Sequence, residues 1–166
     1  MPDEADGVPW DSSAFAVRVI EALHLVPLPV EGGRWAQSWR DERCSAIYYL
    51  LVTPEFSALH RLAHLEIYAY HAGAPLAMLL LYPDGVVSHV VLGPDVAAGQ
   101  RPQVVVPAGV WQTSESTGAW SLVGTVVVPP YTDGIVEFAV ADELADRYPD
   151  QMSEIRRLCS EVHSTE

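Results

Sequence analysis

The spacing of hydrophobic side chains changes twice along the chain and predicts a helix, a long β region and a helical tail. In "DSSAFAVRVIEALHL" apolar residues recur near helical spacing after three candidate N-cap residues, which predicts a helix over residues 11–25. The preceding "MPDEADGVPW" is acidic and contains proline and glycine, so residues 1–10 are predicted to be flexible. Helical spacing returns over residues 141–166, where short helices are expected to pack outside the β region.

Residues 35–140 contain short runs of β-branched, aromatic and leucine side chains, separated by Gly, Pro, Asp and Ser. Examples are "SAIYYLLV", "LAMLLLY" and "WSLVGTVVV". Many short strands with frequent turns predict a mainly β fold, either a sandwich or a barrel. A chain of 166 residues without an internal repeat is expected to form a single domain, residues 1–166.

Composition narrows the classes of partner. The chain has 22 Asp and Glu residues against 9 Lys and Arg, a formal net charge of -13, so we expect neither a nucleic-acid partner nor an anionic membrane surface. The N-terminus lacks the basic and apolar regions of a signal peptide, and no apolar run is long enough to span a membrane. The two cysteines form no metal or disulfide pattern. These features predict a soluble cytoplasmic protein.

The stretch "SALHRLAHLEIYAYHAG" carries the candidate chemistry. Three of the six histidines fall in it, beside one carboxylate and two tyrosines. Because side chains alternate between the faces of a strand, Glu66, Tyr68 and Tyr70 are expected on one face, and His60 shares a face with Leu62 on the preceding strand. Such polar groups inside an apolar barrel require a partner, water or a ligand. The pattern therefore predicts a site.

The same stretch and a later turn resemble the two signature motifs of the cupin superfamily. The first motif has two histidines separated by one residue, then a glutamate and a glycine, and the second has Pro-x-Gly followed by a histidine. Here His60, Glu66 and Gly73 match the pattern, whereas Leu62 and Gln112 stand at the two other histidine positions. The resemblance implies a double-stranded β-helix, or jelly-roll barrel, with one N-terminal helix and short C-terminal helices.

Within the superfamily the chain is most similar to a small single-domain family long catalogued as of unknown function. The matching segments are "EGGRWAQSWR", "SAIYYLL", "SALHRL", "PAGVWQ", "LVGTVVVPPY" and "RYPDQMSEIRRL", which cover nearly the whole chain. The sequence departs from typical members at Pro29-Val30, at Ala36-Gln37 and at Ala69. The ligand is therefore expected to differ from that of typical members.

The resemblance extends to sugar-nucleotide epimerases that share the cupin fold, in which a His and a Tyr act on opposite sides of a carbon next to a carbonyl. It implies His60 as the base, because the pKa of histidine lies near neutrality, with Glu66 orienting it. Tyr68, Tyr70 or Tyr131 would supply the acid. Side chains expected to bind a small-molecule substrate are Trp35, Arg40, Tyr48, Tyr70, Trp111, Gln112 and Trp120.

Alternatives to an isomerase, epimerase or lyase remain open. A metal-dependent cupin oxygenase would hold a divalent metal through His60, Glu66 and Gln112, but the loss of two histidine ligands favours chemistry without an obligatory metal or other cofactor. A second alternative is a cupin that binds a small molecule without turnover. His60 and Glu66 could also form a purely structural pair, each meeting the hydrogen-bonding need of the other. Because cupins commonly pair through strands, the resemblance also implies a homodimer.

Overall fold

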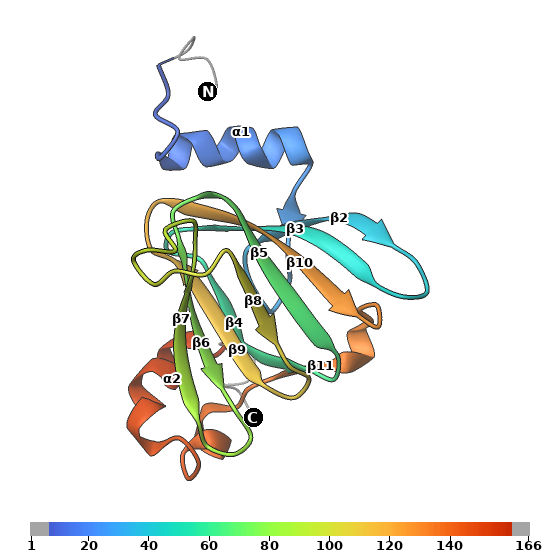
Figure 1. The fold of residues 1–166 in the computed structure, drawn as a ribbon, viewed down its shortest axis with the longest axis vertical. Helices are drawn as coiled ribbons and strands as arrows, with labels where there is room; N and C mark the ends of the chain where they lie inside the picture. Colours follow the sequence, from blue (N-terminus) through green and yellow to red (C-terminus); the bar gives the residue numbers. More distant parts are fainter. Residues whose placement is uncertain (1–6, 161–166) are drawn as a thin grey trace.

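The structure is a computed structural model that describes residues 7–160 (Figure 1). The outer parts of the expected flexible N-terminus and helical tail, residues 1–6 and 161–166, lie outside the described residues. None of the described helices is long and apolar enough to cross a membrane.

The predicted N-terminal helix is confirmed as α1, Ser13–Leu23. Ser12 caps it, because the Ser12 hydroxyl accepts a hydrogen bond of 3.3 Å from the backbone N–H of Phe15. The helix ends at His24, whose left-handed backbone, with φ of 54°, stops further helical hydrogen bonding.

Within residues 7–160, eleven strands form two antiparallel sheets that pack face to face. The six-stranded sheet has the order β1-β2-β3-β10-β5-β8 and the five-stranded sheet the order β11-β4-β9-β6-β7. The strands are β1 (Val26–Pro27), β2 (Arg34–Arg40), β3 (Ser45–Val52), β4 (Phe56–Leu62), β5 (Leu65–Gly73), β6 (Leu76–Leu81), β7 (Val87–Leu92), β8 (Gln103–Val106), β9 (Trp111–Ser116), β10 (Trp120–Val128) and β11 (Val136–Phe138).

This arrangement confirms the predicted jelly roll and changes one detail of it. In the described residues the two sheets keep separate strand orders, so the layers form an open jelly roll and not a closed barrel. Neighbours far apart in sequence are paired, as β10 with both β3 and β5, and β4 with β9. This topology places the two motif-bearing segments side by side.

The predicted helical tail is present as short elements. After β11 the chain forms the 3-10 turns Ala141–Leu144 and Pro149–Gln151 and then α2, Met152–Leu158. Ile155 and Leu158 of α2 are buried, and Ile155 packs on the outer side of the five-stranded sheet. On the other side of the molecule, α1 covers part of the six-stranded sheet through the cluster around Leu50 and Trp120 (Figure 1).

The apolar core fills only part of the space between the sheets. Its inner cluster consists of leucine, valine, methionine and two tyrosine side chains, centred on β3, β5 and β6. Beyond it, the buried residues become polar and include His60, Glu66, Gln112 and Thr125. The polar side chains therefore gather at one end of the jelly roll.

Candidate functional site

A cavity of about 440 Å³ opens at the end of the jelly roll where the core turns polar. It is bounded by both sheets, by the loop before β2 and by the segment after β10. The lining residues are Leu28, Glu31, Trp35, Gln37, Arg40, Ser45, Ile47, Tyr49, His60, Leu62, Glu66, Tyr68, Thr125, Val127, Tyr131, Thr132 and Asp133.

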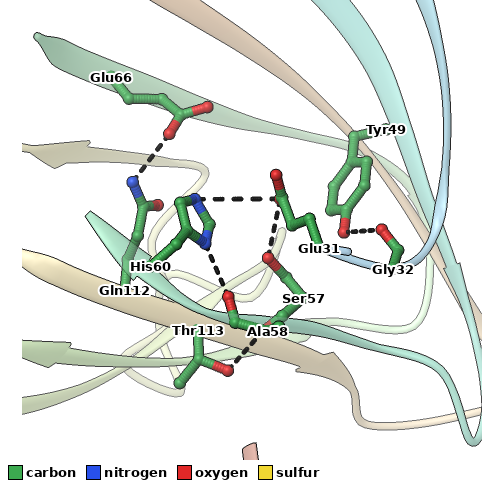
Figure 2. Close-up of polar contacts among 9 residues, drawn as sticks. All are labelled: Glu31, Gly32, Tyr49, Ser57, Ala58, His60, Glu66, Gln112 and Thr113. Carbon is green, nitrogen blue, oxygen red and sulfur yellow. Dashed lines mark hydrogen bonds and ion pairs between the residues drawn. The ribbon is translucent and has the colours of Figure 1, made fainter. Parts of the chain in front are cut away.

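His60 lies on β4 with only 2% of its surface exposed, and one of its ring nitrogens is already engaged. Its Nδ1 lies 2.7 Å from the carbonyl oxygen of Ala58 (Figure 2). A carbonyl oxygen only accepts hydrogen bonds, so Nδ1 carries the proton in this contact. In the neutral ring Nε2 is then the unprotonated nitrogen. The backbone of β4 thus selects the tautomer of a cavity-lining histidine.

Glu31 is the carboxylate that sequence reasoning missed. Its Oε1 lies 3.9 Å from Nε2 of His60 and accepts a hydrogen bond of 2.9 Å from the hydroxyl of Ser57 (Figure 2). Sixteen per cent of the Glu31 side chain is exposed, so its charge acts in a largely dry environment. The signal in the sequence is an acidic residue directly before the paired glycines Gly32 and Gly33.

The glycines explain how Glu31 comes to face His60. Gly32 has φ of 94°, and a Cβ there would lie 2.5 Å from the carbonyl oxygen of Phe56. Only glycine accommodates both conditions. The loop is tied down further by the hydroxyl of Tyr49, which donates a hydrogen bond of 2.7 Å to the carbonyl oxygen of Gly32.

Glu66 and Gln112 form a buried pair beside His60. Nε2 of Gln112 donates a hydrogen bond of 2.8 Å to Oε2 of Glu66 (Figure 2). Burial raises the pKa of Glu66, and the charge of Glu31 adds to the rise, while His60 and the hydrogen bond from Gln112 oppose it. His60 and Gln112 are direct cross-strand partners on β4 and β9, which brings the two cupin-like motifs together.

Three tyrosines line the cavity, and each remains a neutral phenol at physiological pH. Desolvation raises the pKa of Tyr68 and of Tyr49 well above the ordinary value. Desolvation raises the pKa of Tyr131 to about 12, with further contributions from the charges of Glu31, Asp133 and Glu66. Tyr68 lies on β5 of the six-stranded sheet, opposite the sheet that carries His60. The cavity therefore has a candidate base on one layer and a hydrogen-bond donor on the facing layer.

The structure brings six of the predicted residues together around the cavity. Gln112 does not line the cavity but donates a hydrogen bond to one of the six, Glu66. His60, Glu66, Tyr68, Tyr131, Trp35 and Arg40 all line the cavity. A guanidinium N–H of Arg40 donates a hydrogen bond of 2.7 Å to the carbonyl oxygen of Tyr131, which joins the end of β2 to the segment after β10.

Five of the seven predicted binding residues do not line the cavity: Gln112, described above, and Tyr48, Tyr70, Trp111 and Trp120. On β3 the lining side chains are Ser45, Ile47 and Tyr49, so strand alternation turns Tyr48 to the outer face. The expected inward position of Tyr70 is found, but Tyr70 packs against the apolar core and its hydroxyl bonds the carbonyl oxygen of Gly73.

The two remaining residues are tryptophans that serve packing. Trp111 lies in the cluster beneath the C-terminal segment, with the guanidinium of Arg61 4.5 Å from its ring centre. Trp120 stacks on Phe15 of α1 at 5.9 Å and donates a hydrogen bond of 3.0 Å to the carbonyl oxygen of Trp10. Both tryptophans lie outside the cavity lining, and their contacts pack the C-terminal segment and α1 against the sheets.

The side chains around the cavity do not fit a cupin metal centre. Among residues 7–160, no three His, Cys, Asp or Glu side chains are grouped as metal ligands would be. Leu62 offers no donor atom, and Gln112 directs its N–H toward Glu66, while its buried Oε1 has no hydrogen-bond partner in the described residues. First-row metals in proteins require more imidazole and carboxylate donors than this arrangement supplies.

Comparisons with known proteins agree with the fold and the motifs. The family model described as "Cupin superfamily (DUF985)" matches residues 17–139. A crystal structure of a Shewanella oneidensis protein is 36% identical, with a TM-score of 0.81 over 87% of this chain and 96% of that one. A hypothetical protein from Leishmania major is 27% identical, with a TM-score of 0.82 over 88% and 99% of the two chains.

More distant structures share the fold alone. Oxalate decarboxylase from Bacillus subtilis is 11% identical, with a TM-score of 0.55 over 81% of this chain and 37% of that one. A comparison with curated protein sequences gives no match. The family model covers most of the chain and includes both motifs around the cavity. The chain therefore belongs to the family described as "Cupin superfamily (DUF985)".

Proposed function

We propose that the protein is a small-molecule enzyme that uses His60 for acid/base chemistry, as an isomerase, an epimerase or a related lyase. The observation that carries the proposal is the fixed orientation of His60. Its Nδ1 is held by the carbonyl oxygen of Ala58 at 2.7 Å, and its Nε2 lies 3.9 Å from a carboxylate oxygen of Glu31 at the cavity wall. A base needs this combination of a free lone pair and a neighbouring anion that stabilises the protonated ring.

In the proposed reaction, Nε2 of His60 removes a proton from a carbon next to a carbonyl group. The electron pair of the broken C–H bond moves onto the carbonyl oxygen, and the imidazolium is stabilised by Glu31. Ser57 holds Glu31 in place through its hydrogen bond of 2.9 Å. The proton lost from carbon thus stays on the enzyme, available for return to the substrate.

Phenols supply the second half of the chemistry. Tyr68 and Tyr131 remain protonated because their pKa values are raised, so each can donate a hydrogen bond to the enolate oxygen. Reprotonation of carbon from the side opposite His60 would invert its configuration, and return of the proton by His60 to another atom would give isomerisation. Loss of a leaving group from the enolate would give a lyase.

The test is hydrogen exchange in D2O with a panel of chiral 2-hydroxy ketones, 2-amino ketones and hexose derivatives, followed by proton NMR. Incorporation of deuterium next to the carbonyl is expected for one class. The His60→Gln variant should lose the exchange by roughly 100-fold or more, the usual contribution of a general base. Saturable binding without exchange would identify a noncatalytic binding protein, and oxygen consumption that chelators abolish would identify an oxygenase. Either result would overturn the proposal.

Two expectations from the sequence stay predictions. We propose a cytoplasmic location, which the free thiols of Cys44 and Cys159 support, because a reducing compartment keeps such cysteines unpaired. We also propose the homodimer that the cupin resemblance implies. Light scattering of the purified protein would check the dimer by its mass.

A further inference from the structure

We propose that the cavity selects a small organic cation, an amine in its ammonium form, and disfavours carboxylates and phosphates. This substrate class narrows the proposed function, but the binding preference stands on the charge distribution alone. It does not require that the ligand be turned over.

The charged groups of the cavity lie at different depths. Glu66 is 6% exposed and the Glu31 side chain 16% exposed, so both carboxylates lie within the cavity walls. Arg40 and Asp133, of opposite charge, are exposed. These two offset each other in a region where solvent screens them.

Buried charges decide the preference because the interaction of two charges grows as the local dielectric falls. Among the described lining residues, Arg40 is exposed and donates to the carbonyl oxygen of Tyr131, so His60 is the buried group that can carry positive charge beside the two carboxylates. A single imidazolium leaves this buried group with net negative charge whenever both carboxylates are ionised. When His60 is neutral and acts as a base, the two carboxylates have no buried positive charge beside them. An ammonium group near Glu31 would supply that charge, whereas an anion would meet repulsion.

Tyrosines on three walls of the cavity lie within reach of the charges of Glu31 and Glu66. The charge of Glu31 contributes to raising the pKa of Tyr49, Tyr68 and Tyr131, and the charge of Glu66 contributes at each as well. These side chains lie on β3, on β5 and after β10. Desolvation is the larger cause of the raised pKa of each tyrosine, and the two carboxylates add to it on all three walls.

The rest of the lining suits an amine that carries an apolar or aromatic body. Trp35 provides a flat ring that favours contact with cations, and Ile47, Leu62 and Val127 provide apolar walls. A volume of about 440 Å³ lies within the range of small-molecule sites. The probe ligand should therefore combine one ring with one charged group.

The experiment compares three molecules of nearly equal size: 2-phenylethylammonium, 2-phenylethanol and phenylacetate. Each is titrated into 15N-labelled protein at pH 7.5, and the dissociation constant is taken from shifts of cavity-lining amides such as Thr125. The ammonium is expected to bind about 10-fold more tightly than the alcohol, equivalent to roughly 1.4 kcal/mol. Phenylacetate should give no saturable shifts.

Charge-matched variants separate the cavity from the overall charge of the protein. Glu31→Gln should weaken binding of the ammonium about 10-fold and leave the alcohol unchanged, since it removes the carboxylate and keeps its shape. Glu137→Gln removes the same charge from a carboxylate that pairs with Arg61 at 2.8 Å on the surface, outside the cavity lining, and should change neither affinity.

Three results would overturn the inference: equal or tighter binding of the alcohol, saturable binding of phenylacetate, or no saturable binding of the ammonium. Equal weakening by Glu31→Gln and Glu137→Gln would also overturn it, because the effect would then come from net charge. His60→Gln should keep the preference for the ammonium. Failure of the deuterium exchange thus remains distinguishable from failure of the cation site.

Discussion

The side-chain amide of Gln112 donates a hydrogen bond of 2.8 Å to Glu66, at the two positions where the cupin motifs have a histidine and a glutamate. A histidine there would present a lone pair to a metal, whereas Gln112 presents an N–H to the carboxylate. The glutamate is thus satisfied by a neutral donor within the protein. Beside this pair, His60 is directed toward Glu31 at 3.9 Å. The positions of the cupin motifs thus hold a hydrogen-bonded pair and a histidine that faces a carboxylate.

Restoring the two missing histidines should restore metal binding. Leu62→His together with Gln112→His would add two imidazole donors to His60 and Glu66, on positions that the motifs share with metal-dependent cupins. After incubation with manganese, iron, nickel or zinc and removal of excess metal, the double variant should retain about one ion per chain, measured by mass spectrometry of the metals. The parent protein should retain far less.

The parent protein is the control in this experiment, and the folded state of the variant is checked by circular dichroism. Near-stoichiometric metal in the parent would contradict the prediction. It would mean that His60 and Glu66 recruit ligands that the arrangement of the described side chains does not offer.

Replacing Glu31 should slow chemistry at His60 without unfolding the protein. Glu31→Gln removes the anion that stabilises the imidazolium but leaves an oxygen to accept the hydrogen bond from Ser57. We expect deuterium exchange to fall roughly 10- to 100-fold, a loss within the range for electrostatic stabilisation of a charged intermediate. Ser57→Ala should have a smaller effect, because it only loosens Glu31. The reverse order of the two variants would show that Ser57 acts by itself.

The pKa of Glu66 predicts a pH-dependent gain in stability for Glu66→Gln. Burial raises the pKa of this carboxyl in the folded protein, so the folded state holds the proton to higher pH than the unfolded chain. The free energy of unfolding contributed by Glu66 therefore falls as pH rises from the unfolded-state pKa through the folded-state pKa. Below both values the charged form is absent and the penalty vanishes.

Glu66→Gln removes the ionisable group and keeps an oxygen for the hydrogen bond from Gln112. In thermal melts the melting temperature of the variant should lie a few degrees above that of the parent at pH 8 and equal it near pH 4. Each kcal/mol of added stability raises the melting temperature by about 2–4 °C. The exposed Glu137→Gln should show no such trend. A variant that is less stable than the parent at pH 8 would show that the charge of Glu66 stabilises the fold.

Sequence spacing predicted the fold because strand alternation and turn residues are local signals. It placed the helix over residues 11–25, against Ser13–Leu23 in the structure, and a mainly β region over 35–140, which the cupin resemblance specified as a jelly roll. The cupin resemblance grouped His60, Glu66 and Gln112 at one site, and the structure pairs His60 with Gln112 across β4 and β9. The separation of the two sheets did not follow, because edge pairing depends on contacts that no local pattern records.

The site was predicted less completely than the fold, for reasons that differ among residues. The sequence predicts Tyr48 in the cavity, but on β3 Ile47 and Tyr49 are the lining residues, so strand alternation places Tyr48 on the outer face. Trp111 and Trp120 were chosen for their size, which suits core packing equally well. The sequence does not predict that Glu31 faces His60, because the two residues are far apart along the chain and Glu31 lies in a loop with no regular periodicity.

The loop that carries Glu31 provides the last prediction, through Gly32. Alanine at this position would have to adopt φ of 94° and place its Cβ 2.5 Å from the carbonyl oxygen of Phe56. The backbone conformation alone costs about 1–2 kcal/mol, and the clash forces the loop to move. Gly32→Ala should therefore lower the melting temperature by several degrees and reduce deuterium exchange, because Glu31 would leave His60. Gly134→Ala is the matched control, since a Cβ there meets no atom within 4 Å and the melting temperature should stay within about 2 °C of the parent. A Gly32→Ala variant as stable and active as Gly134→Ala would show that the loop is not what positions Glu31.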